Sequence, residues 1–199
     1  MPTGWFRWAG PAMMLGGLLF VVVFFVENNF VFWLAPLALL LLVWGLVAIH
    51  VQHTSGSRVL QTIGLLVTIL GLAMFFLGGV LIGVIRLSAH HELIEDRVYT
   101  FGISPGFHLV LPIGLLLFGL AITRVKVLPR WGRNLLLLMG AVGCLGIPTA
   151  ILYWSGFDAV VLFLVVAVTG LPLLLGWMPL GYALWSSNNG KTLHPEATK

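Results

Sequence analysis

Histidine and acidic side chains gather in the longest polar stretch of the chain. His90, His91 and Glu95 lie in this stretch, and His108 begins the apolar run that follows. On a helix, His91 and Glu95 are four residues apart and share a face. Neutral imidazole and carboxylate together suit Zn²⁺ or a similar cation. The sequence therefore predicts a metal site made by His90, His91, Glu95 and His108, if residues 87–98 fold back over the end of the apolar region.

The same stretch also has the composition of a pH-responsive segment. Histidine titrates near pH 6.5, so the charge of this segment changes within the physiological range. Glu92 and Asp96 are four residues apart with like charge, which disfavours a helix until a cation neutralises them. One hypothesis is that acid or a divalent metal orders residues 87–105. The alternative is a solvated amphipathic segment on the membrane surface.

Other chemistry finds little support in the sequence. The string HELIE resembles the H-E-x-x-H of zinc proteases, but Glu95 stands where the second histidine is required. His50 and His53 can share a helix face, yet a structural zinc needs about four ligands and none is near them. A haem would need paired axial ligands, and on the outer side only His108 lies close to an apolar run, with His90 or His91 as a possible partner from the loop. With no GxSxG elbow and no phosphate-binding glycine loop, we expect no enzyme activity and no cofactor.

The composition indicates an integral membrane protein. Of the 199 residues 60% are hydrophobic and 8% are charged, against about 25% charged in soluble domains. The mean hydropathy is +1.09. The net charge of +4 comes from basic residues at the ends of apolar runs, where they set orientation, so no nucleic-acid partner is expected. Cys144 is the single cysteine, which excludes an internal disulfide.

Six apolar runs are long enough to cross a bilayer core of about 30 Å as helices. The predicted fold is an all-α, polytopic transmembrane bundle of six spans in residues 1–185, followed by a polar cytoplasmic tail in residues 186–199. The runs are residues 9–26, 30–50, 59–85, 106–123, 134–153 and 159–185.

The distribution of basic residues predicts the orientation. In the six-span arrangement eight lysines and arginines fall on the side that holds both termini, and only Arg86 and Arg97 fall on the other side. This bias places both termini in the cytoplasm. The eight are Arg7, Arg58, Arg124, Lys126, Arg130, Arg133, Lys191 and Lys199.

Residues 59–85 are predicted to be a central helix against which other spans pack. This run has no charge, and small residues recur along it. Glycine lets another backbone approach closely, which is how helices associate in lipid. The predicted helix-packing residues are Gly64, Gly71, Gly78, Gly79 and Gly83.

No acidic residue lies inside an apolar run, and each lysine and arginine lies at the end of a run or in a loop. Ion-coupled carriers and voltage sensors need charge at membrane depth, so this class is disfavoured. Pro148, Pro172 and Pro179 are expected to kink the fifth and sixth spans. Kinked packing is the simpler interpretation, and a substrate site at broken helices is the alternative.

Two segments resemble a pattern in uncharacterised multi-pass membrane proteins of bacteria. In residues 114–131 a span ends in Arg124, a short link follows, and Leu-Pro-Arg-Trp opens the next span. Residues 180–185, Leu-Gly-Tyr-Ala-Leu-Trp, are similar to the way such proteins end their last helix. The resemblance implies a polytopic protein of the bacterial cytoplasmic membrane and transfers no active site.

The sequence leaves three functions open. The first is a structural or accessory interaction subunit of a membrane assembly, whose partners are the lipid bilayer and other membrane subunits or further copies of the chain. The second is a small transporter or lipid-handling protein that uses the kinked fifth and sixth helices. The third is an extracytoplasmic metal or pH sensor.

Overall fold

The chain is helical throughout the part that the structure describes. The computed structural model describes residues 4–25, 31–52, 58–85, 106–123, 128–148 and 168–192, and these ranges contain no strand. The prediction of an all-α chain is confirmed over them. The six α-helices are α1 (Ala9–Phe25), α2 (Ala35–Val51), α3 (Arg58–Ile85), α5 (Leu111–Ile122), α6 (Arg130–Cys144) and α9 (Trp177–Thr192).

Tighter or wider turns precede three of these helices. The 3₁₀ segments Gly4–Trp8 (η1) and Val31–Leu34 (η2) lead into α1 and α2, and the π-helical segment Gly106–Val110 (η4) leads into α5. Proline lies in the first turn of α2 and of α5. At that position its missing N–H has no intrahelical acceptor to lose. The sequence therefore starts these helices without breaking them.

Three helices are long and apolar enough to cross a membrane. They are Trp5–Val23, Arg58–Ile85 and Val168–Asn188. The apolar helices Ala35–Val51 and Gly106–Ile122 are shorter, at the lower end of the roughly 17–25 residues of a spanning helix. Length and composition thus indicate a membrane protein with three candidate spans among the described residues.

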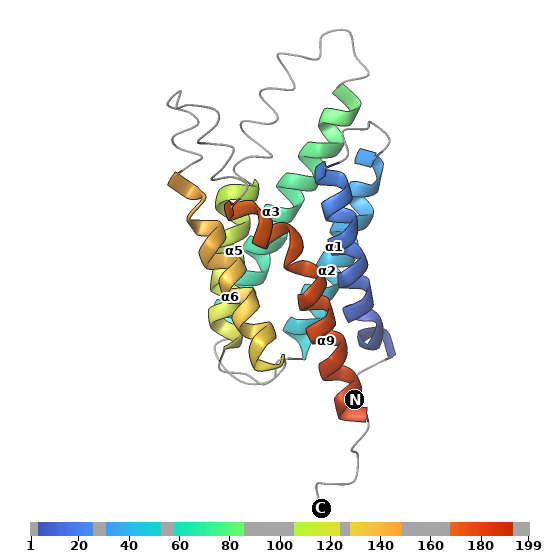
Figure 1. Cartoon of the computed structure of the whole chain (residues 1–199), viewed down its shortest axis with the longest axis vertical. Helices are drawn as coiled ribbons and strands as arrows, with labels where there is room; N and C mark the ends of the chain where they lie inside the picture. Colours follow the sequence, from blue (N-terminus) through green and yellow to red (C-terminus); the bar gives the residue numbers. More distant parts are fainter. Residues whose placement is uncertain are drawn as a thin grey trace, which may run out of the picture.

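Neighbouring helices run in opposite directions (Figure 1). The most extensive contact joins α3 to α5, and α5 to α6, α1 to α9 and α1 to α2 follow. In Figure 1, α1, α2 and α3 form one side of the bundle, α5 and α6 form the other, and α9 crosses between them. The starts of α1, α3 and α6 therefore share one end, which we call the basic end because Arg7, Arg58, Arg130 and Arg133 lie there.

The backbones of α3 and α5 approach closely at three successive levels. Gly64 of α3 contacts the backbone of Phe118, and Gly114 of α5 contacts the backbone of Thr68. One turn further on, a Cβ atom placed on Gly71 would lie 2.5 Å from the backbone nitrogen of Leu111. Each level thus has glycine on one helix only, contributed by α3, then α5, then α3.

Close contacts at glycine also join two other pairs of helices, and one of these pairs shows the same alternation. Between α1 and α9 the glycine comes from α1, then α9, then α1, and between α5 and α6 two levels use α6 and the third uses α5. Because the contacts recur at intervals of three or four residues, they follow one face of each helix. The pairs are Gly10–Trp185, Gly181–Met14 and Gly17–Trp177, then Gly143–Pro112, Gly140–Leu116 and Gly119–Leu137.

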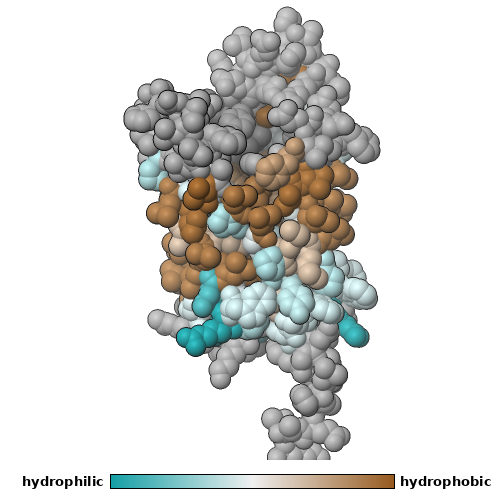
Figure 2. All heavy atoms as spheres, in the orientation of Figure 1, coloured by the Kyte–Doolittle hydropathy of each residue, from teal (hydrophilic) through white to brown (hydrophobic). Residues whose placement is uncertain are grey.

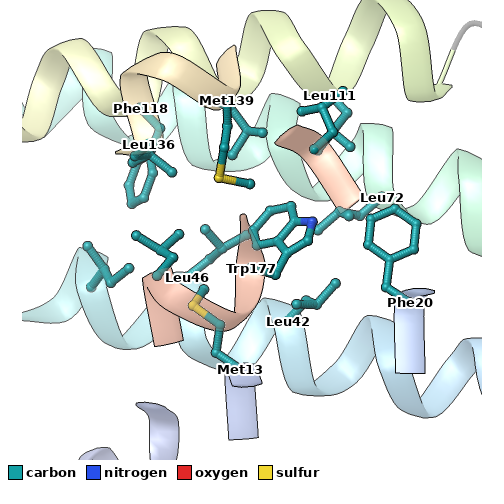
Figure 3. Close-up of a cluster of buried hydrophobic side chains, with 14 of the residues drawn as sticks. Met13, Phe20, Leu42, Leu46, Leu72, Leu111, Phe118, Leu136, Met139 and Trp177 are labelled. Carbon is teal, nitrogen blue, oxygen red and sulfur yellow. The ribbon is translucent and has the colours of Figure 1, made fainter. Parts of the chain in front are cut away.

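The centre of the bundle is apolar and is organised around Trp177. Trp177 is fully buried, and Figure 3 shows its indole between Leu42 of α2, Met139 of α6 and Leu72 of α3. It is the largest of the fully buried side chains. The first residue of α9 therefore fills the space between the two sides of the bundle.

The last helix is interrupted just before Trp177. Residues 168–175 are helical, Gly176 is a turn residue, and α9 begins at the next position. Pro172 and Pro179 cannot donate to the carbonyls four residues before them. The Gly176 amide nevertheless donates to the Pro172 carbonyl at 3.0 Å, so the chain bends here without unwinding. Figure 1 shows the part before the bend leaning toward α5 and α6, while α9 runs along α1.

Some predicted boundaries differ from the observed ones. The fifth span was expected to begin at residue 134, but α6 begins at Arg130. Pro129, which is extended with ψ of 155°, ends the preceding link and lets the helix start directly after it. The segment expected to be a polar tail from residue 186 is helical as far as Thr192.

The helix α3 is not enclosed on all sides. One of its faces is buried against α5 and α2, and the opposite face exposes a continuous apolar stripe. It forms one wall of the bundle, and α5 and α2 pack against its inner face. The stripe consists of Val59, Ile63, Leu66, Leu70, Leu77, Leu81 and Val84.

We predict that Gly71→Leu lowers the melting temperature in detergent far more than Leu66→Ala. A side chain at position 71 would push α3 away from Leu111, and overpacking costs about 1–3 kcal/mol. Leu66 is 60% exposed on the apolar stripe, so its truncation leaves the interface with α5 intact. Equal melting temperatures for the two variants would show that this close approach does not stabilise the fold.

Candidate functional site

Of the four residues predicted to bind a metal, the structure describes one. His90, His91 and Glu95 lie outside the described residues, as does the whole segment 87–105. His108 lies in η4, is 9% exposed and packs edge-on against the ring of Phe107, with 5.0 Å between the ring centroids. The described ranges hold no group of three potential metal ligands. The metal site therefore stays a prediction.

A cluster of phenylalanines positions η4, and hence His108. Phe20 of α1 lies 5.0 Å from both Phe75 and Phe76 of α3, and 6.1 Å from Phe107, measured between ring centroids. The Phe75 and Phe107 rings are 5.3 Å apart. Edge-to-face and tilted pairs of this kind each contribute about 0.5–1.5 kcal/mol beyond burial. The cluster holds α1, α3 and η4 together at the end of the bundle opposite the basic end.

The predicted packing glycines are all buried in α3. Gly64 and Gly71 meet α5, as described above. Gly78, Gly79 and Gly83 lie in the part of α3 that approaches its C-terminal end. The complementary glycines on the partner helices, above all Gly114, were not among the predicted packing residues. The signal was present, because Gly114 and Gly119 interrupt an otherwise bulky run.

The buried polar groups within the described bundle are few and scattered. The Thr68 hydroxyl donates to the Gly64 carbonyl at 2.7 Å, which satisfies it within α3. The side-chain nitrogens of Gln61 and Trp177 are buried without a hydrogen-bond partner among the described residues. A buried, unpaired N–H costs about 1–3 kcal/mol. The indole N–H of Trp177 is thus a polar group in an apolar centre, next to the bend at Gly176.

Arginine and aromatic side chains form the basic end. The Arg133 guanidinium donates to the Thr123 carbonyl at 2.6 Å and links the start of α6 to the end of α5. Trp131, Tyr182 and Trp185 form a row, with ring centroids 6.3 Å and 5.9 Å apart. Tryptophan and tyrosine are enriched where a membrane meets water. This row indicates the level of the interface on α6 and α9.

A groove opens at the basic end between the start of α1 and the end of α9. Its volume is about 510 Å³. The Asn188 side-chain amide donates to the Phe6 carbonyl at 3.2 Å and holds the two segments together. Nothing in the spacing of the sequence indicates that Arg7 and Trp8 lie next to Trp185. The groove is lined by Arg7, Trp8, Pro11, Met14 and Trp185.

No protein-family model, curated protein or solved structure matches this chain. The resemblance carried by residues 114–131 and 180–185 therefore stays a prediction.

Proposed function

We propose that the chain crosses the bacterial cytoplasmic membrane six times, with both termini in the cytoplasm, and that it serves as a structural or accessory interaction subunit of a membrane assembly. The observation that carries this proposal is the position of charge. None of the six acidic residues of the sequence lies in an apolar run, and Arg7, Arg58, Arg130 and Arg133 share one end. Such a chain offers its apolar surface to lipid or to other helices.

The shape of the bundle supports the six spans. The shorter helices α2, α5 and α6 lie along the long helices and alternate with them in direction (Figure 1). Figure 2 shows a broad apolar band across the bundle, with pale and teal residues at its lower edge, the basic end. Soluble monomers rarely expose apolar patches beyond a few hundred Å². All six helices would therefore share one bilayer.

The interaction role is supported by what the glycines do. Gly64, Gly114, Gly71 and their counterparts in α1, α6 and α9 are used between helices of the chain itself. A partner subunit would then contact larger side chains, such as those of the apolar stripe on α3. Large apolar side chains in lipid associate only where shapes match, since lipid is as apolar as leucine.

Cysteine labelling tests the topology. In a Cys144→Ala background, Ser55→Cys, Lys126→Cys and Gly190→Cys should react with an impermeant thiol reagent only from the cytoplasmic side. Ile94→Cys should react only from the outside. Labelling of positions 94 and 126 from the same side would contradict the six spans.

Native mass spectrometry tests the assembly. Protein extracted from its own membrane in mild detergent should appear at a mass well above that of one chain, 21.7 kDa, with one fixed stoichiometry. A species of several identical chains and a species with a second subunit both agree with the proposal. A mass of one chain alone, after crosslinking in the intact membrane, would overturn it.

A transporter or lipid-handling protein is the second candidate. The bend at Gly176 and the unpaired indole N–H of Trp177 favour it. Pro172 and Pro179 cannot donate the usual helical hydrogen bonds to the carbonyls of Val168 and Leu175. Backbone carbonyls of this kind at membrane depth can bind a substrate. This function requires a water-filled path to the bend.

Reactivity of position 169 separates the two candidates. Thr169 is 4% exposed and lies near Gly146 of the preceding segment. Under the first proposal, Thr169→Cys in the Cys144→Ala background is unreactive toward a charged methanethiosulfonate. A control cysteine at position 55, in the polar link between the second and third apolar runs, should react fully under the same conditions. Rapid reaction at position 169 would show a water-filled path and favour the transporter.

A further inference from the structure

The groove at the basic end combines one cation with an apolar floor. The Arg7 side chain is exposed, and no hydrogen bond or ion pair joins it to another described residue. Trp8 and Trp185 line the groove and are exposed. Pro11 and Met14 of α1 also line it and are half-buried, and we call these two its apolar floor. A free guanidinium above apolar side chains is suited to a molecule with an anionic head and an apolar body.

We propose that this groove binds an anionic phospholipid of the cytoplasmic leaflet, with the lipid phosphate on Arg7 and one acyl chain along α1. The proposal rests on the membrane orientation proposed above. A guanidinium binds phosphate through two parallel N–H donors, and its charge is permanent. The described ranges contain no aspartate or glutamate, so within them no carboxylate competes for Arg7.

The aromatic side chains place the groove at headgroup depth. Trp8 is 64% exposed, and Trp185 continues the row of Trp131 and Tyr182. Tryptophan and tyrosine collect at the membrane–water interface. The Arg7 guanidinium, which lies beside them, is therefore at the depth of the lipid phosphates. A free phosphate ion would meet the same cation but would leave the apolar floor uncovered.

The floor of the groove continues into the lipid-facing surface. Along α1, Trp8 and Pro11 are followed at helical spacing by Leu15 and Leu18, which are about half exposed. Along α9, Trp185 and Tyr182 are followed at helical spacing by Pro179, which is also exposed. These residues continue the apolar surface of α1 and α9 from the groove toward the middle of the bundle. A lipid acyl chain has the length and the chemistry to lie along this surface.

Lipid titration followed by native mass spectrometry tests the proposal. Delipidated protein in detergent is titrated with dioleoyl-phosphatidylglycerol, and separately with dioleoyl-phosphatidylcholine, which has the same chains and no net charge. We expect one phosphatidylglycerol molecule to bind more tightly than any phosphatidylcholine. Arg7→Gln should weaken this binding roughly fivefold, the scale of one basic residue at an anionic membrane, and Arg7→Lys should retain most of it.

The matched control is Arg58→Gln. It removes one exposed arginine at the same end, outside the groove, and should leave the binding unchanged. Equal losses for the variants at positions 7 and 58 would mean general attraction to charge and would overturn the site. Equal binding of the two lipids, or displacement of the lipid by inorganic phosphate, would also overturn it. If cysteine labelling reverses the orientation while Arg7→Gln still weakens binding, the groove remains a lipid site and only the leaflet changes.

Discussion

The fold depends on the close approach of helix backbones at glycine. Inside lipid, burial of apolar side chains gives little drive for helices to associate, so packing contacts must provide it. Between α3 and α5 the two backbones come close at Gly64, Gly114 and Gly71, because glycine has no side chain to separate them. Since α5 also meets α6 through Gly119, it joins both sides of the bundle. Among the described residues, few buried polar groups are available to hold the helices together instead.

The bend at Gly176 solves a packing problem that follows from this arrangement. A straight last helix would lie along α1 or along α6, but it has to cover both. Gly176 allows Met139 of α6 to approach its backbone closely, and Trp177 then fills the centre. Pro172 and Pro179 lower the energetic cost of the bend, because each removes a backbone hydrogen bond that bending would otherwise strain. The same bend leaves the Trp177 indole N–H without an acceptor among the described residues.

Long apolar runs and proline positions were sufficient to predict most helices. The run at residues 59–85 agrees with α3 almost residue for residue, since charge and loop residues bound it on both sides. The predicted start of α6, residue 134, lies four residues after the observed start, because Arg130 and Arg133 suggested a loop. In the structure the Arg133 side chain donates a hydrogen bond to the end of α5 instead. The glycine period identified one face of α3 correctly. Pairing that face with Gly114 required knowledge of which helices are neighbours.

The candidate sites were harder to predict for a related reason. A metal site assembled from a polar connection depends on how that connection folds, which no periodicity encodes. The groove takes Arg7 from the start of the chain and Trp185 from near its end. Each residue alone has the ordinary character of a membrane anchor. Only the antiparallel packing of α1 and α9 brings them together.

The alternation of glycine between paired helices also restricts how the chain can change length. One residue inserted between Gly64 and Gly71 would rotate the rest of α3 by about 100°. Gly71 would then leave the seam with α5, and a bulky neighbour would take its position. Insertions and deletions in such a protein are therefore confined to the connections between helices, while each helix keeps its register as strictly as a strand in a sheet.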